Sequence, residues 1–220
     1  MKKTLFLLLV VFLVSGVSQA LAYDYGVSVG DTVRWNGSYV GSGGEFGFSV
    51  VSSPDDANYD NTGFKWSTFC AEMGQNLAWT NTVDGIGNSN SLGTGTLTDT
   101  AAWAYWNFSQ GDLEGYSSFS KRDQNDLQQL IWLEMGQISN AFYYDASQVL
   151  EWTSLASADI AGGWTNSGLV QVLQFTDSQD VLVAAINPNT NPVPEPASMA
   201  LLGIGLLGLV VVGRKKAKKN

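Results

Sequence analysis

The chain has 220 residues, with 11 basic and 20 acidic side chains and a formal net charge of −9 at pH 7. It contains no histidine and one cysteine, which excludes Ser-His-Asp catalysis, histidine-based zinc sites and an intramolecular disulfide. All 20 acidic residues but only four basic ones lie between Asp24 and Glu195. Because such a surface repels phosphate backbones, nucleic acid is not an expected partner.

The first 22 residues have the three-part layout of a secretory signal peptide. Lys2 and Lys3 precede an apolar run, and the small-residue site Ala20-Leu21-Ala22 follows it. We therefore predict a signal peptide at residues 1–22 that is cleaved after Ala22, and a single exported domain at residues 23–186.

The first part of this domain has strand composition. Three segments combine aromatic or β-branched residues with Gly-rich turns: 32–40, 45–53 and 64–73. In the third segment Phe64, Trp66 and Cys70 fall on one face, so Cys70 is expected to point into the core. Residues 80–96 are rich in Asn, Gly, Ser and Thr and predict a loop or a loose hairpin.

The later part changes to a helical pattern and then returns to strands. Helices are predicted from Asp99 to a break at Gly111, from the S-x-x-D capping box at Ser120 to about Gly136, and over residues 146–156. Two final strands are predicted at residues 169–175 and 181–186. This order predicts an α+β domain, an antiparallel sheet or sandwich with a central helical segment.

The C-terminal end reads as a linker, an apolar helix and a basic tail. Residues 187–196 are rich in Pro and Asn and predict an extended linker. Residues 197–213 are apolar apart from Ser198 and predict a single transmembrane helix, which would span about 26 Å of a bilayer core about 30 Å thick. The basic residues of the tail, 214–220, are Arg214, Lys215, Lys216, Lys218 and Lys219. By the positive-inside rule the tail stays in the cytoplasm and the domain faces outward.

This ordered arrangement, with Pro194-Glu195-Pro196 before the apolar helix, resembles the PEP-CTERM sorting signal. The resemblance implies an exported protein of a Gram-negative bacterium that is recognised by an exosortase. It further implies transient anchoring in the inner membrane, cleavage near the motif, and transfer to the cell surface or the exopolysaccharide matrix.

The second predicted helix carries a polar residue on its apolar side. Gln128, Ile131, Trp132 and Met135 form one stripe at i, i+3, i+4 and i+7, while Gln129 is rotated away from it. A buried amide must be hydrogen-bonded or used covalently. The lone Cys70, in an oxidising compartment, must likewise be buried or used.

Thr68-Phe69-Cys70-Ala71-Glu72 and Leu127-Gln128-Gln129-Leu130-Ile131-Trp132 together resemble the thioester domains of bacterial surface adhesins. The resemblance implies that Cys70 and Gln128 form an internal thioester, which an amine of a partner surface then attacks. Two positions depart from the family: Leu127 and Leu130 stand where Thr and Ala are common, and a bulky Leu130 could hold Cys70 and Gln128 apart.

Asp56, Asn58 and Asp60 provide oxygen ligands at alternate positions, as at the start of a calcium loop. The spacing of Gly and Glu that an EF-hand needs is missing, so a solvated acidic turn is the preferred interpretation. No metal or other cofactor is predicted.

These observations favour an exported structural or adhesive protein of the cell surface or matrix. It is not predicted to be an enzyme, apart from a single-turnover thioester crosslink. The expected partners are an exosortase, the membrane before processing, and exopolysaccharide or the amines of surface proteins. The alternatives are a carbohydrate-binding module and a secreted glycosidase using two of the acids.

Four tryptophans are predicted to be core (Trp66, Trp103, Trp106 and Trp132), and four are less constrained (Trp35, Trp79, Trp152 and Trp164).

Overall fold

The computed structural model describes residues 23–36, 44–53 and 63–186. The signal peptide with Ala20 and Ala22, the calcium candidates, the linker, the predicted apolar helix and the basic tail lie outside the described residues. Within the described ranges, no helix is long and apolar enough to cross a membrane.

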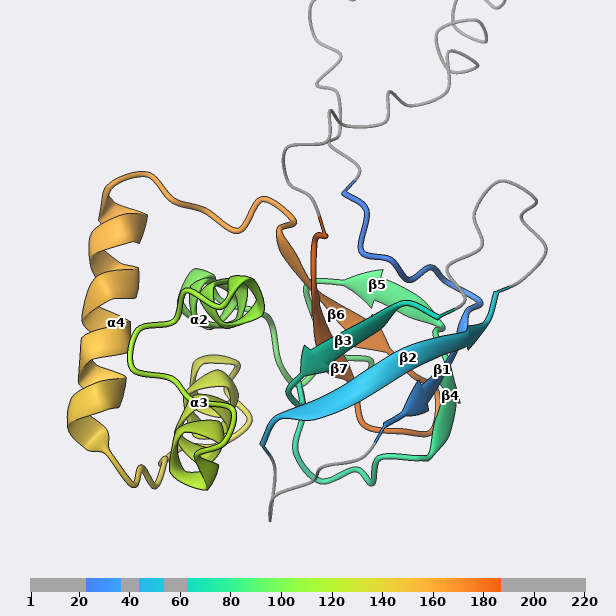
Figure 1. Cartoon of the computed structure of the whole chain (residues 1–220), viewed down its shortest axis with the longest axis horizontal. Helices are drawn as coiled ribbons and strands as arrows, with labels where there is room; N and C mark the ends of the chain where they lie inside the picture. Colours follow the sequence, from blue (N-terminus) through green and yellow to red (C-terminus); the bar gives the residue numbers. More distant parts are fainter. Residues whose placement is uncertain (1–22, 37–43, 54–62, 187–220) are drawn as a thin grey trace, which may run out of the picture. The chain divides into compact units, whose positions relative to one another are not determined.

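Two antiparallel sheets pack against each other (Figure 1). The larger has the order β3-β2-β1-β4 and the smaller the order β5-β6-β7. The strands of the larger sheet are β1 (Thr32–Trp35), β2 (Phe46–Ser52), β3 (Lys65–Thr68) and β4 (Thr80–Thr82). Those of the smaller sheet are β5 (Gly85–Gly87), β6 (Val170–Gln174) and β7 (Val181–Ala184). Their inner faces share a core in which the rings of Phe48 and Phe175 lie 6.0 Å apart. The predicted α+β class is confirmed, and of the two predicted forms, sheet or sandwich, the structure has the sandwich.

The segment that was expected to be a loop or loose hairpin instead supplies one strand to each sheet. β4 pairs with β1, whereas β5 pairs with β6. Val83, between them, is fully buried, and its amide donates to the carbonyl of Asp31. The next amide, of Asp84, donates to the carbonyl of Gln174 in the other sheet. Pairing with existing strands therefore outweighs the weak strand propensity of this segment.

The three predicted helices are present as α2 (Asp99–Gln110), α3 (Lys121–Glu134) and α4 (Ala146–Ala161). Thr98 caps α2, which ends at Gly111 in the left-handed conformation, φ 78°. Ser120 caps α3 by accepting from the amide of Asp123. α4 begins after the N-cap Asp145 and runs five residues beyond the predicted end at 156.

The helices form a layer on one side of the sandwich (Figure 1). α2 contacts β6 and β7, and α4 packs against α2 and α3. Trp152 of α4 is fully buried in the core between the helices, and its indole N–H donates to the carbonyl of Glu114 at 2.7 Å. The sequence did not predict whether Trp152 is buried, because the helical pattern of residues 146–156 is weak. The helical layer matters for function because α3 carries Gln128.

Candidate functional site

The residues that follow β3 continue alongside β7. The amide of Leu182 donates to the carbonyl of Phe69, and the amide of Ala71 donates to the carbonyl of Asp180. Phe69 and Ala71 belong to the core under the helices, whereas Cys70 belongs to the core of the sandwich, against which Trp66 also packs. The predicted inward direction of Cys70 is therefore confirmed.

The side-chain amide of Gln128 forms hydrogen bonds with both main-chain groups of Cys70, the amide and the carbonyl. Its Oε1 accepts from the Cys70 amide at 2.9 Å, and its Nε2 donates to the Cys70 carbonyl at 2.9 Å. Both residues are buried, with exposed fractions of 2% for Cys70 and 1% for Gln128. Ile131, Trp132 and Met135 of the same stripe are buried as well. The structure thus brings together the two residues that the sequence singled out.

The leucines that depart from the thioester-domain pattern do not separate Cys70 from Gln128. Leu127 and Leu130 are buried in the core under the helices, away from the sandwich core that contains Cys70. Gln129 is half-buried, and its Oε1 accepts from the amide of Phe142 at 3.3 Å. The helical periodicity of α3 therefore correctly predicted that Gln128 is more buried than Gln129.

Burial controls the reactivity of the thiol. Loss of hydration raises the pKa of Cys70 well above its ordinary value, and the negative charge of Glu72 raises it further. The thiol is therefore neutral at physiological pH and shielded from reagents in solution. Any reaction at its Sγ has to begin from the protonated thiol and from a partner already inside the site.

A pair of buried carboxyl groups lies next to Cys70, which the sequence did not indicate. Glu72 and Asp180 are both fully buried. Glu72 Oε1 accepts from the Asp180 amide at 3.2 Å, while Oε2 has no hydrogen-bond partner among the described residues. Asp180 accepts from the amides of Phe175 and Ser91. Glu72 lies four residues after β3 and Asp180 lies in a polar turn, and neither position gives a sequence signal of burial.

The environment of these two carboxyl groups favours their protonated forms. Burial raises the pKa of Glu72, and the charge of Asp180 adds to this effect. Burial also raises the pKa of Asp180, against the lowering effect of its hydrogen bonds from Ser91 and Phe175. The described residues contain no cluster of three or more His, Cys, Asp or Glu side chains that could hold a metal ion.

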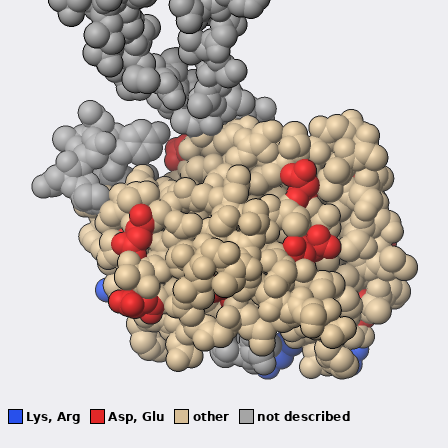
Figure 2. Space-filling view, turned by 180° about the vertical axis from the view of Figure 1, so that it is seen from behind, with Lys and Arg blue, Asp and Glu red and all other residues tan. Residues whose placement is uncertain are grey.

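The outer surface carries its charges in a dispersed pattern. The four basic residues of the domain are exposed: Arg34, Lys65, Lys121 and Arg122. On the face shown in Figure 2 the acidic side chains occur singly or in small groups, and the few basic atoms lie at the edges. This face therefore offers no basic patch for a polyanion.

Residues 192–216 match the family model of the PEP-CTERM protein-sorting motif. Searches of curated proteins and of solved structures found no match to this chain. The motif identifies an exported protein that is sorted by an exosortase, secreted, and anchored in the membrane only transiently. The predicted Pro194-Glu195-Pro196 signal lies within the matched residues.

Proposed function

We propose that the exported domain is an adhesive module of the cell surface or matrix that acts through an internal thioester between Cys70 and Gln128. The observation that carries this proposal is the position of the Gln128 carboxamide, which is held on the main chain of Cys70 by two hydrogen bonds in a buried site. The motif at residues 192–216 supports the surface location.

The two hydrogen bonds favour the chemistry of ring closure. Sγ of Cys70 attacks Cδ of Gln128, and the carbonyl oxygen becomes an oxyanion. The Cys70 amide, which already donates to that oxygen at 2.9 Å, stabilises the developing charge. The thiol proton passes to Nε2, and the bond between Cδ and Nε2 breaks. Ammonia leaves, and the new bond between Sγ and Cδ completes the thioester. The raised pKa of the Cys70 thiol slows this attack, because the thiolate is the better nucleophile, and the fixed position of the carboxamide beside Cys70 offsets that cost.

The same burial would preserve the product. Water is excluded from a site in which Cys70 and Gln128 are almost fully buried, so hydrolysis of the thioester is slow. A primary amine of a partner surface that reaches the acyl carbon forms an amide with the Gln128 side chain and releases the Cys70 thiol. The product is a covalent link between the two surfaces.

The test is the intact mass of the purified mature protein, measured after unfolding in acid. We expect a mass one ammonia lower than the sequence requires, and recovery of mass with a free thiol after treatment with methylamine. Cys70→Ala and Gln128→Ala should each abolish both effects, and Gln129→Ala is the matched control that should retain them. Alkylation of the folded protein cannot distinguish a thioester from a free thiol, because a buried free thiol also resists alkylation.

A full sequence mass, together with one thiol that is alkylated after unfolding, would reject the thioester. Gln128 would then serve to pair with the main chain of Cys70, and the domain would be a surface protein without covalent chemistry.

Processing provides a second prediction. Because the sorting motif precedes the apolar segment 197–213, we expect the mature surface form to lack the residues beyond about Pro196. Mass spectrometry of peptides from surface-extracted protein measures this directly. A deletion of Pro194–Pro196 is the control and should leave the C-terminal peptides in place. Peptides containing Lys215–Lys219 in the mature wild-type protein would contradict the expected cleavage.

A further inference from the structure

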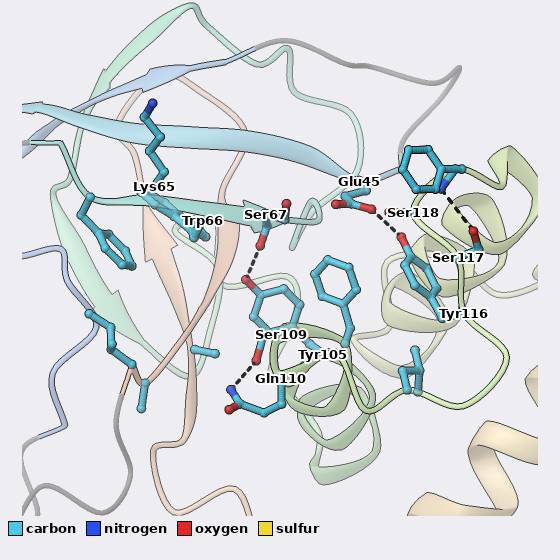
Figure 3. A pocket seen from close by; sticks show the side chains of 18 residues that line it. Glu45, Lys65, Trp66, Ser67, Tyr105, Ser109, Gln110, Tyr116, Ser117 and Ser118 are labelled. Carbon is cyan, nitrogen blue, oxygen red and sulfur yellow. Dashed lines mark hydrogen bonds between the residues drawn. The ribbon is translucent and has the colours of Figure 1, made fainter.

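A cleft of about 810 Å³ opens between the sandwich and the helical layer (Figure 3). One side is formed by residues 64–67 and 184–186, and the other by the end of α2 and the loop at residues 111–119. Tyr105 lies at its base, where its hydroxyl donates to the carbonyl of Ser67 at 3.0 Å. Neither Cys70 nor Gln128 lines this cleft.

Aromatic rings line both sides of the cleft. Phe64 and Trp66 are half-buried and stack with their centroids 5.7 Å apart and their planes at 15°. Across from Trp66, Phe108 and Tyr116 meet edge to face at 5.2 Å. Phe119 also lines the cleft, with 98% of its surface exposed. The Phe119 ring therefore contributes nothing to the core and is free to stack on a ligand bound in the cleft.

The polar groups of the cleft are mostly neutral. Four exposed residues supply hydroxyl and amide groups: Ser109, Gln110, Ser117 and Ser118. Glu45 accepts from the Tyr116 hydroxyl at 2.9 Å. Lys65 extends from β3 away from Tyr105 (Figure 3). The described lining therefore lacks an inward cation that would attract a phosphate or a uronic acid.

We propose that this cleft binds a neutral oligosaccharide segment of an extracellular polysaccharide. A pyranose ring presents a face of C–H bonds that stacks on aromatic rings, and a rim of hydroxyls that exchange hydrogen bonds with Ser and Gln side chains. The cleft offers both, and its volume suits a ligand of a few sugar units. Glycoside hydrolysis uses two carboxyl groups, whereas the described residues that line the cleft include one carboxylate, Glu45, which favours binding over hydrolysis. This inference goes beyond the proposed thioester and does not depend on it.

The test is calorimetric titration of the purified mature protein with neutral hexasaccharides of glucose, galactose, mannose and N-acetylglucosamine. Binding of at least one is expected, with a change in tryptophan fluorescence from Trp66. Phe119→Ala should weaken this binding about five- to tenfold, the value of one aromatic stacking contact. Phe142→Ala is the matched control, since Phe142 is also exposed, by 69%, but lies outside the cleft.

Three results would overturn the inference: no binding of any of these sugars at millimolar concentration, equal affinity of the Phe119→Ala and wild-type proteins, or binding of anionic polygalacturonate alone. Gln110→Ala provides a second variant at an exposed position that folding does not require, and it should also weaken binding. Cys70→Ala should bind the sugar as wild type does, which separates this result from the outcome of the thioester test.

Discussion

Gln128→Ala should lower the free energy of unfolding by about 4 kcal/mol or more. In the protein with a free thiol, the substitution leaves the amide and the carbonyl of Cys70 buried without partners, at about 1–3 kcal/mol each. It also removes the buried methylene and amide atoms, and comparable truncations in cores cost about 2–5 kcal/mol. Urea denaturation followed by tryptophan fluorescence measures the effect. Gln129→Ala, at the adjacent half-buried position, should cost much less, and equal losses at the two positions would contradict the importance of the Cys70 contact.

The stability of Cys70→Ala shows whether Cys70 is a free thiol or part of a thioester with Gln128. If the thiol is free, the substitution keeps both hydrogen bonds of Gln128 and costs about 1 kcal/mol for one buried sulfur. A thioester would instead close a chain segment across a separation of 58 residues. By the chain-entropy argument for crosslinks, its loss costs about 4 kcal/mol. The stability of this variant therefore gives an answer independent of mass measurement.

Glu72 and Asp180 should make the domain less stable as the pH rises from about 4 through their raised pKa values, while Asp145, whose pKa is lowered by its hydrogen bonds, acts in the opposite sense. The folded state raises the pKa of Glu72 above its ordinary 4.5 and that of Asp180 above its ordinary 3.8. The folded state therefore binds more protons than the unfolded state within this window. The resulting stability is fully present below the ordinary pKa values and is lost as the pH rises through the raised ones. Each carboxyl group contributes a slope of at most about 1.4 kcal/mol per pH unit.

Denaturation of Glu72→Gln at several pH values tests this explanation. The variant should show a shallower pH dependence and greater stability at neutral pH, because a neutral amide replaces a carboxyl group that resists ionisation. The hydrogen bond from the Asp180 amide can be kept by the new carbonyl oxygen. Glu151→Gln, on the exposed side of α4, controls for the change in net charge. An unchanged slope in Glu72→Gln would show that the pH dependence comes from elsewhere.

The helices and the Cys70–Gln128 pair could be predicted because their signals are local. Caps such as Ser120 mark helix ends, and the period of 3.6 residues places Gln128 on the buried side of α3. The period of two places Cys70 in the sandwich core. The two patterns predicted that both residues are buried, and the resemblance to thioester domains supplied their pairing. The structure places the Gln128 amide on the main chain of Cys70.

Features that depend on distant partners could not be predicted. β4 (Thr-Asn-Thr) is short and polar and β5 (Gly-Ile-Gly) is short and rich in glycine, so both depend on pairing with β1 and β6. The burial of Glu72 and Asp180 depends on how the turn after β6 folds back beside residue 72. The aromatic cleft collects residues from β3, α2 and the loop after it, and no single sequence window contains that set.

The position of β7 determines how the domain bears mechanical load. The linker that leads to the sorting motif follows β7 in the chain, so tension on a tethered domain enters through this strand. β7 is hydrogen-bonded to β6 on one side, and residues 180–182 are bonded to residues 69–71 on the other. These bonds lie across the strand, so a pull along it strains them together in shear. While the linker still connects the domain to the membrane before processing, such a pull would be resisted by the hydrogen bonds beside Cys70, and the proposed thioester would pass the force directly to α3.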